Sequence, residues 1–316
     1  MALLPRISVV MPCFNAERYV AAALRSVFAQ QWPDLEVIVV DDGSSDQSCR
    51  LIKEAFPEVH LLRQANRGAA AARNRAIGSA TGDLIAFLDA DDYWLPGKLK
   101  AQWEALAGHP AARMTYTAWV VWDCDDPEPT DHLVASIAAS SSEKRWSGPS
   151  GWIYPDLLLD CAVWTSTVLV QRSLLQELGG FDETLPSGED YDLWLRTSRV
   201  TEIFRVPRPL ALYRMHVSNL TRKAPAENFQ ARVVTNALSR WGYASPDGSA
   251  ARPADVSKAL ARSWRGFASA HAAARNWEYA LHGAAAAVRL DPNHLSAWKL
   301  LAASMIRRLG TRTKKP

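Results

Sequence analysis

Residues 84–92 read Leu-Ile-Ala-Phe-Leu-Asp-Ala-Asp-Asp, a short apolar run that ends in three carboxylates. Three similar runs come before it in the chain, at residues 7–11, 36–40 and 59–63. Longer stretches of helical character separate the runs, at residues 16–30, 46–56 and 68–79. Strands that alternate with helices in this way are typical of a parallel sheet. We therefore predict an α/β fold, with a mostly parallel sheet flanked by helices.

The loops that leave the carboxyl ends of parallel strands line the ligand crevice of such a sheet. The loop after the first run contains Pro12, Asn15 and Glu17, and it lacks the Gly-x-Gly-x-x-Gly turn that lets a dinucleotide approach the backbone. This absence argues against an NAD-dependent dehydrogenase. Asn15 either caps the following helix or lines a nucleotide pocket.

Acidic residues also follow the second run, which continues as Asp41-Asp42-Gly43-Ser44-Ser45-Asp46. A carboxylate at the tip of this strand is placed to accept hydrogen bonds from a nucleoside. A turn and a helix cap account for residues 43–46, but they explain two adjacent acids less well. We predict that Asp41 contacts the nucleoside.

The three carboxylates after the fourth run are Asp89, Asp91 and Asp92. Carboxylates this close raise one another's pKa unless a cation compensates them. Mg²⁺ or Mn²⁺ is the natural compensator, because hard divalent ions prefer oxygen ligands and often bridge carboxylates to phosphates. The alternative is a solvated acidic turn.

Arg73 lies on a helix that opens near the same crevice. There it either reaches a phosphate or the acidic cluster, or lies on the surface.

The order of four motifs makes a resemblance specific: SVVMPCFN at residues 8–15, VIVVDDGS at 37–44, ARN at 72–74 and FLDADD at 87–92. Together they resemble family 2 glycosyltransferases of the GT-A fold, over residues 5–220. The resemblance implies a nucleotide-sugar donor, with UDP favoured. It also implies that Asp41 meets the nucleoside and that Asp89 and Asp91 form an Asp-x-Asp element holding the metal-bound diphosphate. Asp91 is then the first choice for direct metal ligation, and Asp92 is either structural or a sugar contact.

A second acidic motif, at residues 188–196, reads GEDYDLWLR. It resembles the Glu-Asp motif of the same family, in which the Asp is usually the base, and Asp190 is therefore the candidate base. Inverting transfer needs a base that takes the proton of the acceptor hydroxyl. Without the resemblance, Glu189 and Asp190 would read as acids that favour a helix start.

The segment at residues 213–219 resembles one that closes over the diphosphate in some relatives. The resemblance implies that Arg214 neutralises the leaving group. It implies that His216 contacts the metal or a phosphate, although a lone His is often structural. The candidate donor contacts are Pro12, Asn15, Glu17, Asp41, Arg73, Asp89, Asp92 and Arg214, and the candidate metal ligands are Asp91, Asp89 and His216.

The domain organisation follows from the change in pattern along the chain. We predict a catalytic domain at residues 1–225, with a mobile loop or lid at 123–151, and an α-helical region at 226–316. Residues 277–303 resemble one tetratricopeptide-type hairpin. Residues 226–316 carry 14 Lys and Arg against 5 Asp and Glu, a charge of +9, and the rest carries 22 against 28, a charge of −6. The basic tail suits either an anionic membrane surface or plain solvation.

Other properties of the sequence point to a protein of the cell interior. Its four cysteines are far apart and form no Cys-x-x-Cys pair, which favours reduced thiols. The first residues do not resemble a signal peptide, and no apolar run approaches the roughly 18 residues of a membrane span. We expect a cytoplasmic protein, peripheral to the membrane if the basic tail binds it.

Together these features predict an inverting glycosyltransferase that uses Mn²⁺ or Mg²⁺ and a nucleotide-sugar donor. The acceptor is a saccharide, a lipid-linked oligosaccharide or a protein, in the synthesis of cell-surface polysaccharide or glycoconjugate. One alternative is a metal-dependent nucleotidyl or phosphoryl transferase, which has no evident use for a second carboxylate site at Asp190. Another is a non-catalytic scaffold that works through its helical tail. No nucleic-acid partner is expected.

Overall fold

The computed structural model describes residues 4–139, 146–216 and 224–312. The chain divides into two compact units. The first consists of Met1–Ile153 and Ala162–His216, and the second of Tyr154–Cys161 and Val217–Pro316. Residues 154–161 belong to the second unit, although they lie in the chain between two segments of the first. No sequence pattern indicates this.

Eight strands make up the sheet of the first unit, and they are β1 (Ile7–Cys13), β2 (Leu35–Asp41), β3 (His60–Arg63), β4 (Leu84–Phe87), β5 (Tyr93–Trp94), β6 (Ala112–Trp122), β7 (Leu169–Gln171) and β8 (Glu202–Arg214). The helices of this unit are α1 (Val20–Phe28), α2 (Ser48–Ala55), α3 (Ala69–Ser79), α4 (Lys98–Gly108), α5 (Asp131–Ala139), α7 (Arg172–Leu178) and α8 (Glu189–Thr197). A 3-10 turn at Thr165–Thr167 precedes β7.

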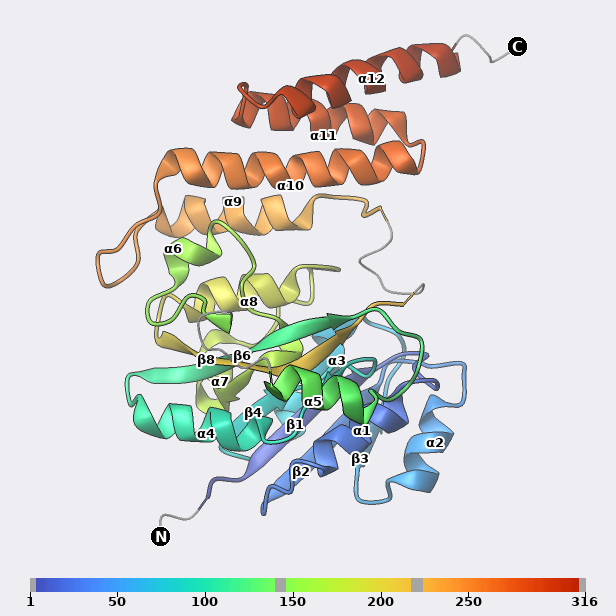
Figure 1. Cartoon of the computed structure of the whole chain (residues 1–316), viewed down its shortest axis with the longest axis vertical. Helices are drawn as coiled ribbons and strands as arrows, with labels where there is room; N and C mark the ends of the chain where they lie inside the picture. Colours follow the sequence, from blue (N-terminus) through green and yellow to red (C-terminus); the bar gives the residue numbers. More distant parts are fainter. Residues whose placement is uncertain (1–3, 140–145, 217–223, 313–316) are drawn as a thin grey trace. The chain divides into compact units, whose positions relative to one another are not determined.

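The strands are ordered β3-β2-β1-β4-β7-β6-β8-β5 across the sheet (Figure 1). Strands β1 to β4 pair in parallel, and so do β6 and β8. Strand β7 runs antiparallel to β4 and β6, and β5 runs antiparallel to β8. The mixed, mostly parallel sheet with flanking helices confirms the predicted fold class.

The sheet is stable because its central strands are apolar on both faces. Every residue of β4 is buried, as is every residue of β1 except the half-buried Pro12. Helices cover both faces of such a sheet, so its strands have no polar side. The apolar runs recognised at residues 7–11 and 84–88 therefore correspond to the buried strands β1 and β4.

The antiparallel strand β7 sets the geometry of the site. It pairs with β4 so that Ala86 lies opposite Leu169. Because the two strands run in opposite directions, the carboxyl end of β4 lies beside the turn that precedes β7. Asp92 therefore meets Trp164 and Ser166, which lie 72 and 74 residues later in the chain.

Two features of the first unit differ from the sequence prediction. Residues 123–151 are not wholly a loop, because α5 lies within them, and residues 140–145 fall outside the described part of the chain. Helix α1 begins at Val20, later than the predicted residue 16. Residues 16–19 form a turn instead, in which the amides of Tyr19 and Val20 both donate to the carbonyl of Ala16.

The second unit is helical, and its helices are α6 (Tyr154–Leu157), α9 (Phe229–Trp241), α10 (Pro253–Ala273), α11 (Trp277–Leu290) and α12 (Leu295–Arg312). Helices α9 to α12 stack in sequence order (Figure 1). The side chain of Asn228 caps α9 by accepting from the amide of Ala231 at 3.1 Å. The described helices include none that is long and apolar enough to span a bilayer.

Candidate active site

Asp41 ends β2 with a side chain that is completely buried. Its Oδ2 lies 3.4 Å from Nε of Arg63. Its Oδ1 is buried and has no hydrogen-bond partner within the described residues. The Cys49 thiol, a weak donor, lies beside this carboxylate, and burial together with Asp41 raises the pKa of that thiol to about 11. A buried acceptor without a good donor is costly unless a ligand supplies one.

The adjacent Asp42 has a different place. Its Oδ1 accepts from the Arg67 amide and from Gln64, and its Oδ2 accepts from the Gly68 amide, at 2.8 to 2.9 Å. These bonds hold the loop that leads into α3. The two neighbouring acids therefore differ. Asp42 holds the backbone of the loop, whereas Oδ1 of Asp41 has no partner within the described residues.

The loop after β1 is tied to the loop after β2. Oδ1 of Asn15 accepts from the Ser45 amide at 2.9 Å, and Oε2 of Glu17 accepts from the Gln47 amide at 2.8 Å. These bonds favour a structural role for Asn15 and Glu17 over the donor contacts expected from the sequence. Pro12 lies inside β1, opposite Val40 of β2.

The three carboxylates after β4 have three different surroundings. Asp91 is partly exposed, and its Oδ2 lies 2.9 Å from Nε2 of the buried His216. Asp89 accepts from the guanidinium of Arg73 at 2.6 Å. Asp92 is buried and accepts from Ser166 Oγ at 2.5 Å and from Trp164 Nε1 at 3.1 Å.

Burial, followed by the charges of Asp91 and Asp89, raises the pKa of Asp92 well above its usual value. Its carboxyl group also accepts from the backbone amide of Arg214 at 3.1 Å, which ties the end of β8 to this turn. Of the two roles that the sequence left open for Asp92, the structural one fits these contacts. A sugar contact would have to displace the bonds from Ser166 and Trp164.

Arg73 joins the two acidic motifs. It is 5% exposed, and its Nη2 donates to Oδ1 of Asp89 while its Nη1 donates to Oε1 of Glu189, each at 2.6 Å. Burial lowers the pKa of Arg73, but the Asp89 and Glu189 carboxylates outweigh it and raise the pKa overall. Of the three alternatives for Arg73, a phosphate, the acidic cluster or the surface, the contact with the acidic cluster is the one observed, and the surface position is wrong.

Asp190 follows Glu189 at the start of α8. Its Oδ2 accepts from Thr165 Oγ1 at 2.8 Å, and its Oδ1 accepts from the amide of Tyr191 at 2.7 Å. Burial, followed by the charge of Glu189, raises the pKa of Asp190 to about 6. A carboxylate poised near neutrality is suited to general base catalysis.

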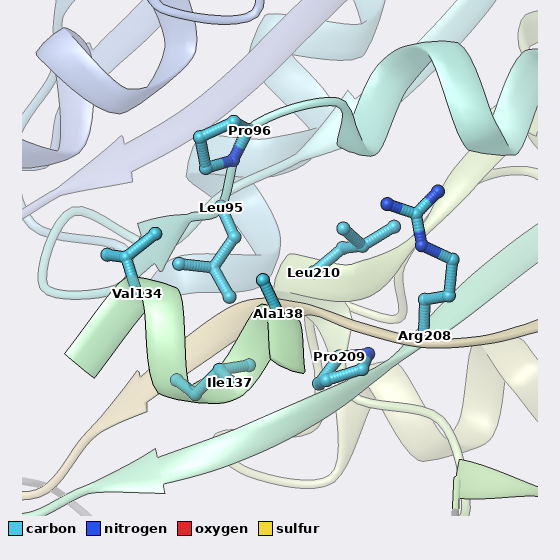
Figure 2. A pocket seen from close by; sticks show the side chains of 8 residues that line it. All are labelled: Leu95, Pro96, Val134, Ile137, Ala138, Arg208, Pro209 and Leu210. Atoms are coloured by element: carbon cyan, nitrogen blue, oxygen red, sulfur yellow. The ribbon is translucent and has the colours of Figure 1, made fainter. Parts of the chain in front are cut away.

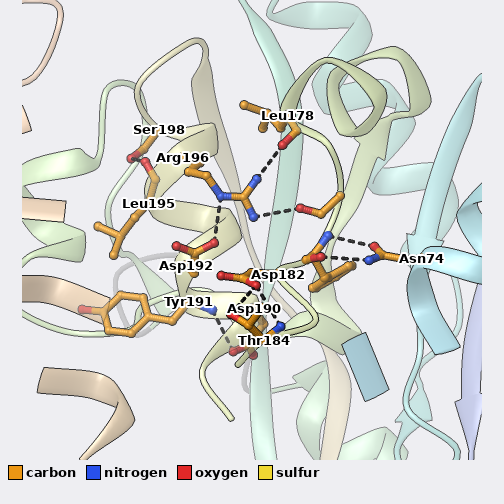
Figure 3. A network of polar contacts seen from close by, with 12 residues as sticks. Asn74, Leu178, Asp182, Thr184, Asp190, Tyr191, Asp192, Leu195, Arg196 and Ser198 are labelled. Carbon is orange, nitrogen blue, oxygen red and sulfur yellow. Dashed lines mark hydrogen bonds and ion pairs between the residues drawn. The ribbon is translucent and has the colours of Figure 1, made fainter. Parts of the chain in front are cut away.

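The position of α8 is fixed by polar contacts with its neighbours (Figure 3). Arg196 donates to Asp192 within the helix and to the carbonyls of Leu178 and Gly180, each at 2.8 Å. Asn74 of α3 exchanges two hydrogen bonds with the backbone of Phe181, each at 2.8 Å. A Cβ at Gly180 would lie 2.5 Å from Oδ1 of Asn74, so this approach requires glycine.

The contacts of Arg214 differ from those of the role that the resemblance implies for it. It is buried between the rings of Tyr19 and Trp122, at 4.5 and 3.9 Å from the two centroids. Its guanidinium donates to the carbonyls of Asp91, at 2.8 Å, and of Pro127, at 2.7 Å, and also to that of Asp126. A guanidinium held by carbonyls is not available to a leaving group in this conformation. The contacts favour a role in positioning the Asp91 backbone.

A small cavity of the first unit is lined by other residues (Figure 2). It has a volume of about 170 Å³ and is lined by Leu95, Pro96, Val134, Ile137, Ala138, Arg208, Pro209 and Leu210. None of the carboxylates at the strand ends lines it. An apolar lining with one arginine offers a nucleotide diphosphate little, so we do not assign the donor to this cavity.

Asp91 and His216 suit a divalent cation. One carboxylate oxygen and one imidazole nitrogen lie side by side, and both ligand types bind Mn²⁺. Residues 4–139, 146–216 and 224–312 contain no cluster of three His, Cys, Asp or Glu side chains arranged to hold an ion. Two protein ligands are nevertheless enough for Mg²⁺-type sites, which draw further oxygens from water and substrate phosphates. Asp89, held by Arg73, fits direct ligation less well than Asp91.

Sequence reasoning missed the turn before β7. Trp164 and Ser166 fix Asp92, and Thr165 donates to Asp190. Nothing local to this turn marks it, because its importance arises only when β7 pairs antiparallel with β4. Sequence reasoning also missed the ion pair between Glu189 and Arg73.

Known proteins resemble this chain in sequence and in fold. A model of glycosyl transferase family 2 matches residues 8–147. The Escherichia coli UDP-Glc:alpha-D-GlcNAc-diphosphoundecaprenol beta-1,3-glucosyltransferase WfgD is 31% identical over 191 residues, which cover 60% of this chain and 68% of WfgD. TarS 1-349 of S. aureus in complex with UDP-GlcNAc has a TM-score of 0.61 at 16% identity, over 96% of this chain and 88% of that one.

The mannosyltransferase PcManGT from Pyrobaculum calidifontis, in complex with GDP-Man and Mn²⁺, has a TM-score of 0.57 at 20% identity. The match covers 99% of this chain and 88% of that one. The fold is therefore that of the GT-A glycosyltransferases. From the likeness to WfgD and the match to the family model, the chain belongs to glycosyl transferase family 2.

Proposed function

We propose that this chain is an inverting glycosyltransferase that moves a sugar from a UDP-sugar to a hydroxyl group of a saccharide, lipid-linked or protein acceptor. The observation that carries the proposal is the bridge of Arg73 between Asp89 and Glu189. The bridge brings the Asp-x-Asp element, which would face the donor, next to Asp190, whose raised pKa suits a base. The buried guanidinium of Arg73 thus lies between two carboxylate sites. One site would bind the donor, and the other would activate the acceptor.

The donor would lie across the carboxyl ends of β1, β2 and β4. Oδ1 of Asp41 would accept from the nucleoside, because it is buried and without a partner in the described residues. Arg73 would keep Asp89 at the sugar diphosphate, and Arg214 would hold the backbone of Asp91 in place. Arg214 is thus assigned to positioning rather than to neutralising the leaving group.

Asp91 and His216 would hold Mn²⁺ or Mg²⁺ together with the donor's diphosphate. When bound, such an ion supplies charge stabilisation to the departing nucleotide. The Asp91 carboxylate and the His216 imidazole already lie 2.9 Å apart, which leaves little rearrangement for shared ligation. PcManGT, named above with Mn²⁺, supports this assignment.

Asp190 would take the proton of the acceptor hydroxyl as its oxygen attacks the anomeric carbon. The new glycosidic bond forms while the bond to the nucleotide diphosphate breaks on the opposite face, so that one displacement inverts the configuration. Thr165 donates to Oδ2 of Asp190 and fixes the direction of the carboxylate. The pKa of Asp190 is about 6, so this base is ionised in most protein molecules at neutral pH.

The relatives support UDP as the nucleotide and a polysaccharide or glycoconjugate product. WfgD is named for UDP-Glc and a lipid diphosphate acceptor, and TarS is in complex with UDP-GlcNAc. We assign this chain to the same kind of synthesis. Residues 1–225 would be the catalytic domain and residues 226–316 a helical region with one tetratricopeptide-like hairpin at 277–303. We place the protein in the cytoplasm, with peripheral membrane contact through the basic tail.

A direct test incubates the protein with Mn²⁺, UDP-Glc, UDP-GlcNAc or GDP-Man, and a set of saccharide and lipid-linked acceptors. We expect transfer from a UDP-sugar, and an anomeric configuration in the product that NMR shows to be inverted. Glu58→Gln, on the surface, is a matched control that should transfer normally. Cleavage between the two phosphates of the donor, without glycoside formation, would favour a nucleotidyl or phosphoryl transferase. Binding of every donor without turnover would favour a scaffold.

A further inference from the structure

Helix α12 has two unlike faces. On the inner face, Ala297 and Ser304 are completely buried, and Leu301 packs with Ala287 and Val288 of α11. With 3.6 residues per turn, positions 297, 301 and 304 fall on one side of the helix. This side accounts for the packing of α12 within its own unit.

The outer face of α12 consists of Leu295, Trp298, Met305 and Ile306. Their exposed fractions are 75%, 49%, 50% and 69%. The same periodicity places them within an arc of roughly 100° that borders the buried positions. Four of the ten large apolar side chains that are exposed in the described residues therefore lie on one helix face. Scattered exposed apolar residues need no explanation, but a gathered row marks an interaction surface.

The charge of this segment is one-sided. Residues 295–316 contain six Lys and Arg and no Asp or Glu. Lys299 and Arg307 are exposed on α12, whereas Arg308 is paired with Glu278 of α11 at 3.1 Å. Lys314 and Lys315 lie outside the described residues. An apolar helix face bordered by cations is the pattern of helices that lie in the interface of anionic membranes.

We propose that the outer face of α12 docks on an anionic lipid surface. Leu295, Trp298, Met305 and Ile306 enter the headgroup region, and Lys299 and Arg307 meet lipid phosphates. The indole of Trp298 is already oriented, because its Nε1 donates to the Pro292 carbonyl at 2.9 Å. A second copy fits this face less well, since a two-fold contact through α12 would bring two sets of cations together. Attraction of the basic tail to a membrane involves charge alone, whereas here a specific helix face also inserts. Docking of this face is independent of the transfer reaction.

The test is flotation of the full chain with vesicles of phosphatidylcholine, alone or with about one third phosphatidylglycerol. We expect the wild-type protein to float with the anionic vesicles and only weakly with the neutral ones. Ile306→Glu puts an acid at the C-terminal end of the outer face and should lower binding about tenfold or more. Leu295→Asp should act in the same direction at the other end, where an acid suits a helix start.

Val200→Glu is the matched control, because Val200 is an exposed apolar residue of the first unit, 42% exposed. It should bind the anionic vesicles within about twofold of wild type. Circular dichroism of each variant shows whether the helices remain. Equal binding by wild type and both α12 variants would overturn the proposal, and so would equal binding to the two kinds of vesicle. Self-association that Ile306→Glu abolishes, without vesicle binding, would assign the face to a second copy instead.

Discussion

The guanidinium of Arg73 donates to Oε1 of Glu189 at a distance of 2.6 Å, in a place where both side chains are shielded from water. The same guanidinium donates to Asp89, so the ion pair links a motif at residues 87–92 to one at residues 188–196. Buried charges persist when each has a partner with good geometry. The link therefore holds the donor side and the acceptor side of the site in register.

Arg73→Lys should weaken this link without removing the positive charge. An ammonium group lacks the planar fork that serves two carboxylates at once. We expect transfer to fall by about 10- to 100-fold and the free energy of unfolding to fall by about 1–3 kcal/mol. Arg75→Lys, on the exposed side of the same helix, is the control. A double variant with Glu189→Gln should lose less than the sum of the singles, and full additivity would argue against the bridge.

Asp41→Asn should weaken nucleotide binding. The substitution keeps the shape of the side chain but removes the charge from an acceptor that the described part of the chain leaves unpaired at Oδ1. Loss of a hydrogen bond to a charged group corresponds to a dissociation constant for UDP that rises about 10- to 100-fold. Calorimetry measures it, with the exposed Asp34→Asn as control. An unchanged constant would remove Asp41 from the nucleoside site.

Metal removal should stop the reaction. In excess EDTA we expect no transfer, and added Mn²⁺ should restore it. Asp91→Asn should weaken UDP binding in the presence of Mn²⁺ and have little effect in its absence, since a carboxamide is a poorer ligand for a hard cation. Turnover that persists in EDTA would contradict the assignment of Asp91 and His216.

The rate of transfer should depend on pH through Asp190. Its pKa is raised to about 6, and a base acts only when it is ionised. The value of kcat/KM should therefore rise about tenfold per pH unit below about pH 6 and level off above it. Mn²⁺ must be kept saturating across the range. A profile that is flat between pH 5 and 7 would mean that Asp190 does not titrate in the reaction.

The sequence indicated much of the first half of the fold for a physical reason. Strands β1 and β4, and most of β2, are buried, so their residues form continuous apolar runs that differ from the helices. Strand β3 lies at the edge of the sheet and is partly exposed. Strand β6 was missed, because it mixes polar and apolar residues along Ala112–Trp122. Strand β7 has only three residues, and its antiparallel pairing is set by the rest of the sheet.

The candidate site shows the same limit. Residue type marked the acids at 89–92 as a group, and the family resemblance marked those at 189–190. It could not show that Asp92 would be enclosed by Trp164 and Ser166 or that Arg214 would be held by carbonyls. Those partners come from distant segments of the chain. Which acid or arginine is structural and which is free to bind a ligand therefore depends on tertiary contacts.

The most direct test of the account compares Asp190→Asn with Glu189→Gln. The substitution at Asp190 keeps the size of the side chain and removes its basicity, so the dissociation constant of the UDP-sugar should barely change. Transfer should fall by about 10²- to 10⁴-fold. Glu189→Gln should cost less, although it weakens the link to Arg73. The measurement is donor affinity by calorimetry beside the transfer rate, for both variants. Near-normal transfer by Asp190→Asn would contradict the account.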